Sequence, residues 1–506
     1  MKAMPEIPWS ALAPFPVCLA LIGVPLLSLA AVIRTRTRRE TLLIALAGAG
    51  AELILAGYLL GALDHASAQV QFAERLPLLP FLNWHTGVDG LSVLFIAATA
   101  LLGFLLVLYG HIAWAKPPSH YMAALFAYQA VLMGLFTALD ALQLWLLAGL
   151  EILPAAYISL RWGRGWERRR ATGLYMHFIV SGLFLLGVGL AILGWHHAGA
   201  AGDWSFDLAE LAATPPPGTL QKLAFVFVLF GLSVRMAQFP FHAWLPELSH
   251  HGTMATTGVF LVGTKLGVYA LLRFLPLVPE AVHEFKPLAV ALGLAGIFYG
   301  ALLALMQLNL RRLLAFAAVS HNGMLLIGVF CLNREGLAGA LLLAIVFGFA
   351  ASALLLASGL LLHRTGTALL PRLGELFDPM PLLGLTFLIA ALSTMAMPGT
   401  PGFDAAHLLL EGAIETHDWG VAVALAIGNV LAAAFLLRAF QRVFLAPRKE
   451  TAIRPIQVRV SLPEALLTGT VCFVLVGTGF YSEPWLAMVD KSVGALAARF
   501  DMHKQH

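Results

Sequence analysis

The chain has 506 residues, of which 60% are apolar and only 11% are charged. Its mean hydropathy is +0.85, whereas soluble proteins carry roughly 25% charged residues, so a water-soluble enzyme is excluded. The net charge of +4 is small and gives no support to a nucleic-acid partner. The three cysteines lie far apart within apolar runs, which fits neither a disulfide framework nor a metal site.

Fourteen apolar segments follow one another along the chain, each about long enough to cross a ~30 Å hydrocarbon core as a helix. They cover residues 12–33, 41–63, 91–113, 119–139, 141–160, 171–195, 221–239, 253–274, 286–308, 312–332, 337–362, 380–397 with 403–415, 419–446 and 462–485. The first run is too long for a secretory signal and has no clear cleavage site, so we expect it to be a membrane span. The sequence therefore predicts an all-α polytopic membrane protein of about 14 transmembrane helices.

The basic residues between the spans predict the orientation. Loops that follow odd-numbered spans hold or adjoin 20 Lys and Arg residues, whereas loops that follow even-numbered spans hold 5. Such an excess marks the cytoplasmic side, so both termini are predicted on the outer (periplasmic) side of a bacterial plasma (inner) membrane. The polar loop 196–220 is expected to form an external cap, and residues 486–506 one amphipathic turn or two that then fray.

Several ionisable residues interrupt the apolar spans. Buried charge is costly in lipid, so each such residue is a functional hypothesis, with an internal salt bridge as the alternative for any one of them alone. The candidates for an ion or proton pathway are Glu151, Arg235, Lys265, His321, Asp404 and His407. Together they indicate a proton or ion route at membrane depth.

Prolines mark two breaks within spans. Pro240 lies five residues after Arg235, and Pro398 and Pro401 precede Asp404. Broken helices are tolerated in lipid only where they line a cavity. The breaks fall in the seventh and twelfth spans, the spacing expected if helices 4–8 and 9–13 form two inverted five-helix repeats. The predicted domains are residues 1–118 (helices 1–3), 119–274 and 286–446 (the two repeats), and 462–506 (helix 14 and a short tail).

Five motifs together resemble the antiporter-like subunits of respiratory complex I. They are GVDGLSVLF, RMAQFPFHAWLPE, KLGVYALLRF, RRLLAFAAVSHNGM and MPGTPGF, and the resemblance covers roughly residues 80–480. The wording of KLGVYALLRF and the absence of a long lateral helix favour the M-type subunit. The resemblance implies a proton-translocating subunit of an NADH:quinone oxidoreductase-like complex, with no redox centre, cofactor or metal of its own.

The functional residues of the family are only partly present in this chain. The family lysine of the seventh helix is Arg235 here, and that of the eighth helix is Lys265. The glutamate of the fifth helix is expected at Gly149, and Glu151 is displaced from it by two residues. Arg keeps its proton at any accessible pH, whereas a buried lysine can release one. The resemblance therefore makes Arg235 a fixed charge, paired with Glu151, and Lys265 a proton carrier.

The remaining family positions are lost. The histidine of the eleventh helix falls on Phe347, and the M-type glutamate after the twelfth-helix break falls on Ala406, which Asp404 and His407 flank. Protons would then be handled by Lys265, His321 and His407. If the two histidines are only hydrogen-bonded core residues, the route is interrupted.

A group of polar residues follows the seventh-helix break. His242, Glu247, His250 and His251 are expected to line an aqueous vestibule. Adjacent histidines rarely ligate one ion together, so no metal site is predicted here.

Three alternative functions are compatible with the same fold. One is the proton-conducting, energising subunit of an inorganic-carbon (CO2/bicarbonate) uptake complex with a zinc-containing, carbonic-anhydrase-like partner. The others are an Mrp-type cation/proton antiporter subunit and a non-conducting membrane scaffold. In each case the expected partners are other subunits of a membrane complex and the lipid bilayer.

Overall fold

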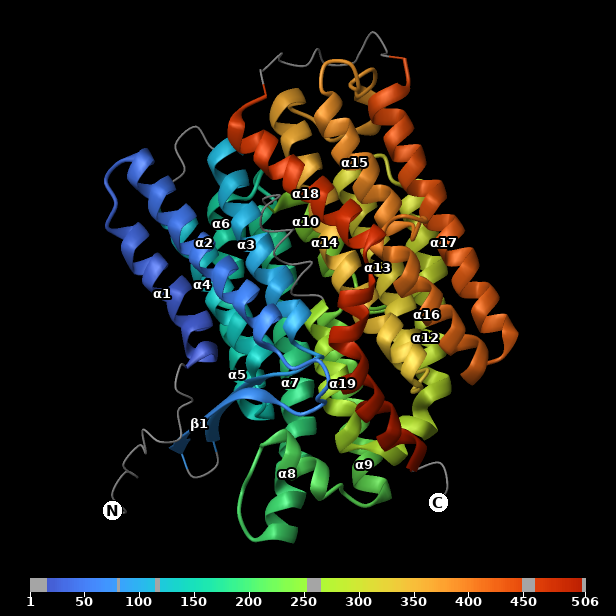
Figure 1. The fold of residues 1–506 in the computed structure, drawn as a ribbon. Helices are drawn as coiled ribbons and strands as arrows, with labels where there is room; N and C mark the ends of the chain where they lie inside the picture. Colours follow the sequence, from blue (N-terminus) through green and yellow to red (C-terminus); the bar gives the residue numbers. More distant parts are fainter. Residues whose placement is uncertain (1–15, 80–81, 114–118, 253–264, 448–459, 503–506) are drawn as a thin grey trace.

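The computed structural model describes residues 16–79, 82–113, 119–252, 265–447 and 460–502. Most of these residues are helical (Figure 1). In chain order the elements are α1 (Val17–Ile33), α2 (Arg38–Ala62), β1 (Gln71–Leu79), β2 (Leu82–Val88), α3 (Val93–Ala113), α4 (Ser119–Thr137), α5 (Ala141–Leu150), α6 (Ile152–Trp162), α7 (Arg168–Ala201), α8 (Leu208–Ala213), α9 (Gly218–Arg235), α10 (Trp244–His251), η2 (Leu275–Leu277), α12 (Pro279–Met306), α13 (Leu310–Val329), α14 (Arg334–Thr365), η3 (Leu370–Arg372), α15 (Pro381–Thr394), α16 (Pro401–Thr416), α17 (Trp419–Phe440), η4 (Gln441–Leu445), α18 (Leu462–Phe480) and α19 (Glu483–Met502). Residues 265–274 are helical as well.

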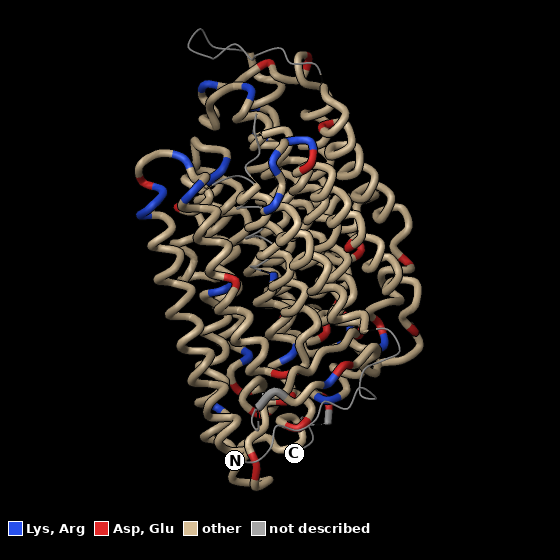
Figure 2. The backbone as a smooth tube through the Cα atoms, turned by 90° about the vertical axis from the view of Figure 1, so that its left-hand side faces the viewer, with Lys and Arg blue, Asp and Glu red and all other residues tan. Residues whose placement is uncertain are grey.

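Long helices lie side by side in one bundle, as expected for a chain that satisfies its backbone hydrogen bonds within lipid. Eleven helices of the described residues are long and apolar enough to cross a membrane. Figure 2 shows most Lys, Arg, Asp and Glu residues at the two ends of the bundle and few between them. These features confirm the all-α membrane fold, while the count of fourteen spans and the inverted repeats stay predictions.

The seventh and twelfth spans are both broken, as the prolines predicted. α9 ends at Arg235 before α10 begins at Trp244, and α15 ends at Thr394 before α16 begins at Pro401. The second residue after each helix end, Ala237 or Ala396, has a positive φ of 53° or 54°. In each case the next residue donates its N–H to the carbonyl five residues earlier, at 2.9 and 3.1 Å. This is the Schellman helix end, so the two breaks share one backbone conformation.

One end of the bundle carries a β-hairpin that the sequence analysis did not anticipate. β1 and β2 pair antiparallel, and His85 of β2 contacts Asp207, the N-cap of α8, at 2.5 Å. Burial tends to raise the pKa of Asp207, but the hydrogen bond and charge of His85, together with the Ala209 N–H and Arg75, lower that pKa. Asp140, the N-cap of α5, is held mainly by its bond from the Gln143 amide, and burial raises its pKa to about 6.

The expectation of a short, frayed C-terminal tail is wrong. α19 is a helix of 20 residues, Glu483–Met502. Val489, Val493 and Phe500 on its apolar face are fully buried, because the helix packs against α14 and η2. The Gly90 amide donates to the Ser492 hydroxyl at 3.0 Å. The amphipathic pattern was visible in the sequence, but the surface that buries it was not.

The start of α1 and the end of α19 lie at the same end of the bundle, beside the hairpin (Figure 1). The first described helix therefore begins on the same side of the bundle on which the last one ends. Which side faces the cytoplasm remains a prediction from the basic residues.

Candidate functional site

Glu151 and Arg235 form an ion pair that is buried inside the helix bundle. Glu151 lies at the junction of α5 and α6, and Arg235 is the last residue of α9. Their side chains are 1% and 8% exposed and in direct contact. The Tyr128 hydroxyl of α4 donates to Glu151 Oε1 at 2.5 Å. Removing one partner of such a pair leaves an uncompensated buried charge, which costs roughly 3–5 kcal/mol.

Lys265 lies beside the same helix end but has a neutral partner. Its Nζ donates to Asn322 Oδ1 of α13 at 2.5 Å, and the lysine is 2% exposed. The Asn322 amide in turn donates to the carbonyl of Met236, the residue that follows Arg235. Asn322 therefore links Lys265 to the broken end of α9. None of the ion pairs among the described residues includes Lys265.

His321 precedes Asn322 and is packed among aromatic rings. Its ring centroid lies 4.2 Å from that of Phe347 and 6.4 Å from that of Phe435. The side chain is buried, and its Nε2 has no hydrogen-bond partner among the described residues. The family resemblance expects a histidine at Phe347, and His321 packs against this ring.

Asp404 and His407 lie apart from this group, on α16. Ala405 and Ala406 are buried, because α16 packs closely on α14 through Gly339, whose added Cβ would lie 2.9 Å from the Ala405 carbonyl oxygen. Asp404 is half-buried and His407 is exposed. Nothing among the described contacts joins either of them to Lys265, and their part in proton transfer stays a prediction.

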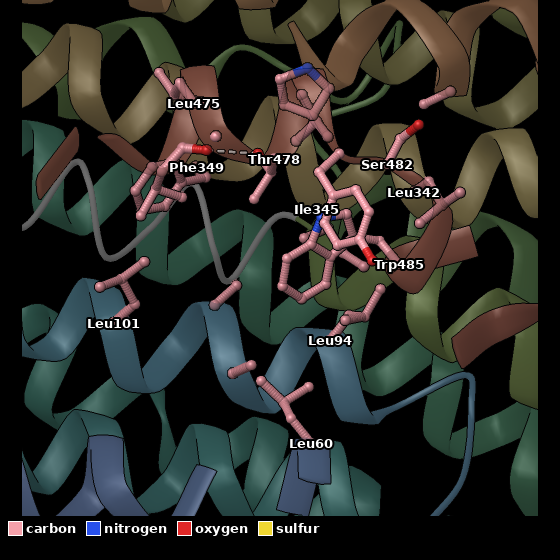
Figure 3. A pocket seen from close by; sticks show the side chains of 18 of the residues that line it. Leu60, Leu94, Leu101, Leu342, Ile345, Phe349, Leu475, Thr478, Ser482 and Trp485 are labelled. Atoms are coloured by element: carbon pink, nitrogen blue, oxygen red, sulfur yellow. Dashed lines mark hydrogen bonds between the residues drawn. The ribbon is translucent and has the colours of Figure 1, made fainter. Parts of the chain in front are cut away.

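Asp404 lines a large apolar cavity of about 590 Å³. Figure 3 shows Leu94 and Leu101 of α3 facing Leu342, Ile345 and Phe349 of α14 across it. Besides Asp404, the polar groups on its wall come from the end of α18 and the start of α19, and they are Thr478, Tyr481, Ser482 and Trp485. The cavity contains neither Lys265 nor the Glu151–Arg235 pair in its lining.

The expected vestibule residues divide into two groups. His242 is buried against aromatic rings, with its centroid 5.0 Å from that of Tyr299. Glu247 pairs with Arg312 at 2.5 Å. His251 Nε2 lies 3.1 Å from the carboxylate of Glu167.

His250 packs edge-to-face on His251, with ring centroids 4.4 Å apart. The Glu247–Arg312 ion pair connects the end of α10 to the start of α13, and the contact of His251 with Glu167 connects it to the segment before α7. Within the described ranges, no group of three or more His, Cys, Asp or Glu side chains is placed to hold a metal ion.

The sequence analysis missed three polar residues in the interior of the bundle. Tyr128 and Asn322 contact the candidate residues directly, and Glu52 of α2 is completely buried. The signal for Glu52 was present, since it is the single charged residue within the apolar run LLIALAGAGAELILAGYLLGA, residues 42–62. Tyr and Asn carry no charge, so the search for ionisable groups passed over them.

Comparison with known proteins gives consistent matches along most of the chain. The family profile described as "NADH:quinone oxidoreductase/Mrp antiporter, TM" matches residues 138–432. An NAD(P)H-quinone oxidoreductase chain 4 of Thermosynechococcus vestitus is 31% identical over 447 residues, which cover 86% of this chain and 82% of that protein. The NADH-ubiquinone oxidoreductase chain 4 of Marchantia polymorpha is 30% identical over 447 residues, covering 87% and 88%.

Solved structures show the same fold. A chain of respiratory complex I from Thermus thermophilus with bound NADH superposes with a TM-score of 0.86 at 27% identity, covering 96% of this chain and 99% of that one. A chain of the Mrp complex from Dietzia sp. gives a TM-score of 0.84 at 21% identity, with 97% and 98% covered. At that identity the second match is a likeness of fold alone.

Proposed function

The chain belongs to the NADH:quinone oxidoreductase/Mrp antiporter family of transmembrane subunits, and we propose that Glu151, Arg235, Lys265 and His321 carry its proton pathway. It is an antiporter-like, proton-translocating membrane subunit of the complex I type. Its partners are other subunits of a membrane complex, as in the assemblies that contain its structural relatives.

The different partners of the two buried cations support this proposal. Arg235 is held by the carboxylate of Glu151 and keeps its proton. Among the described residues, Lys265 has only the neutral oxygen of Asn322 at hydrogen-bond distance, and a lysine can lose its proton when burial disfavours the charged form. Lys265 is thus the group that takes up and releases a proton, and Arg235 is the fixed charge whose field acts on it.

The link through Asn322 supports coupling between the two cations. Asn322 accepts from Lys265 and donates to the carbonyl of Met236, next to Arg235. When Lys265 changes its charge, the hydrogen bond that it donates to Asn322 changes in strength. Because Asn322 also bonds to Met236, this change reaches the end of α9. His321, beside Asn322 on α13, is the next group that can accept a proton.

Lys265→Arg tests the role of the lysine as a proton carrier. The variant keeps the positive charge but cannot release a proton at accessible pH, so proton translocation should stop while the complex still assembles. Proton uptake into vesicles carrying the assembled complex measures this. Lys222→Arg, at an exposed lysine paired with Glu284, is the matched control and should retain the wild-type rate. Unchanged transport in Lys265→Arg would remove this residue from the mechanism.

We also propose that both termini lie outside and that the chain divides into the four parts given above. The inorganic-carbon uptake complex is the alternative to the complex I-type assembly. Purification of the tagged chain from its host, followed by mass spectrometry of what accompanies it, tests the partner assignment. Iron–sulfur and flavin subunits would agree with a redox-driven complex. A zinc protein without redox subunits would instead favour the inorganic-carbon uptake complex.

A further inference from the structure

Glu52 is a buried glutamate in α2 that lies outside the proposed pathway. Its side chain has no solvent exposure, and neither carboxylate oxygen has a hydrogen-bond partner among the residues that the structure describes. An isolated carboxylate in a low-dielectric interior is so costly that the group holds a proton instead. A neutral carboxylic acid at membrane depth is a store for one proton.

The packing of α2 against its neighbours places Glu52 close to α4. Gly48, one helical turn before Glu52, lies against both α1 and α4, since a Cβ added there would overlap Ser28 of α1 and lie 3.4 Å from the ring of Phe126 of α4. Both helices start where α3 ends, because Arg38 at the start of α2 donates to the His111 carbonyl at 3.0 Å and α4 follows α3 along the chain. They therefore run in the same direction, and one turn further on from this contact Glu52 and Gln129 come to the same depth.

Gln129 is itself buried and incompletely bonded. It is 5% exposed, and its side-chain N–H2 group has no partner among the described residues. Its amide lies against Gly103 of α3, where an added Cβ would overlap it. A buried amide donor and a buried carboxyl without partners, on facing helices at one depth, are complementary groups.

A small cavity lies between α3 and α4, beside Gln129 and Tyr128. Its volume is about 20 Å³, and Thr99, Gly103, Tyr128 and Gln129 are among its lining residues. About 10–15 Å³ suffices for one water molecule. Tyr128, on the wall of this cavity, donates its hydroxyl to Glu151 at 2.5 Å. Tyr128 therefore connects the wall of this cavity, which Gln129 shares, to Glu151.

We propose that Glu52 is an additional proton-binding residue that exchanges its proton with Glu151 through Tyr128 and a water molecule beside Gln129. This inference rests on the proposed function. In the transfer, the carboxyl O–H of Glu52 gives its proton to the water, the water gives one to the Tyr128 oxygen, and the Tyr128 hydroxyl proton passes to Glu151. Glu52 is left as a carboxylate, which the N–H groups of Gln129 stabilise, and Glu151 becomes a neutral acid.

Glu52→Gln in the full complex is the main test. Glutamine keeps the shape but cannot exchange a proton, so proton translocation per assembled complex should fall by about 100-fold, the lower end of what a positioned proton-transfer group contributes. Glu40→Gln, at an exposed glutamate at the start of the same helix, is the control and should transport normally. Infrared difference spectra should lose the carbonyl stretch of one protonated carboxylic acid in Glu52→Gln and not in Glu40→Gln.

Two further variants separate the possible explanations. If Glu52→Gln transports at the wild-type rate while Lys265→Arg does not, the role of Glu52 is wrong and the proposed function stands. If both transport normally, the proposed function fails as well. Should Glu52→Gln not assemble, Gly103→Ala provides the test. It displaces the amide of Gln129 without altering Glu52, and a normal rate in that variant would overturn the proposal.

Discussion

At the scale of single residues, the main feature is an arginine where the family resemblance expects a lysine. Arg235 and Glu151 satisfy each other's charge in the bundle interior. Removing either partner would leave a buried charge uncompensated, and arginine keeps its proton, so Arg235 is the fixed charge of the site. The titratable role then falls to Lys265, which has a neutral partner.

Arg235→Lys should preserve assembly and make transport depend on pH in a new way. The positive charge facing Glu151 is retained at low and neutral pH, but a buried lysine can lose its proton as the pH rises, whereas arginine does not. The rate of the variant should therefore fall away at alkaline pH while the wild type stays active. Transport rates across a pH series, normalised to the amount of assembled complex, measure this. Loss of assembly would show that the arginine geometry itself is required.

At the scale of secondary-structure elements, the break between α15 and α16 is covered by the end of α18. A Cβ added at Gly479 of α18 would lie 2.5 Å from the Cα of Thr400 and would overlap the carbonyl of Gly399. Backbone atoms of the break cannot move aside cheaply. The glycine is thus required for α18 to pack against the broken helix.

Gly479→Ala should destabilise this packing by about 1–3 kcal/mol, the usual cost of overpacking. Gly477→Ala is the matched control, because a Cβ at Gly477 meets nothing within 4 Å, and alanine is the better helix former. Thermal denaturation of the purified complex should show a lower midpoint for Gly479→Ala only. Equal midpoints for the two variants would mean that the contact with Thr400 is not made.

At the scale of the whole molecule, the ends of the bundle differ in what they carry. The hairpin, α8, the start of α1 and the end of α19 share one end (Figure 1). The basic residues of loops such as 34–39 and 161–170 are predicted to face the cytoplasm. The orientation proposed from these residues places the hairpin and α8 outside.

Cysteine labelling tests that orientation. Asp203→Cys, in the exposed segment between α7 and α8, should react with a membrane-impermeant maleimide added to intact cells. Arg170→Cys, exposed at the start of α7, should react only after the membrane is permeabilised. Of the native cysteines, Cys18 and Cys331 are buried and Cys472 is half-buried, so the unmodified chain sets the background labelling. The reverse pattern would place both termini in the cytoplasm.

The sequence determined the membrane fold, the two broken helices and the positions of Glu151, Arg235 and Lys265. These features follow from local chemistry: apolar runs need lipid, proline ends a helix, and a charge within an apolar run is too costly to be incidental.

The tertiary structure decided which groups meet. The pairing of Lys265 with Asn322, the bond from Tyr128 to Glu151, the burial of Glu52 and the docking of α19 all depend on how helices are rotated against one another. Helices that are apolar nearly all round carry little periodic signal for that rotation. The rotation of each helix is fixed by close contacts that neighbouring helices make at small residues such as Gly48 and Gly103. These contacts exist only in the packed bundle.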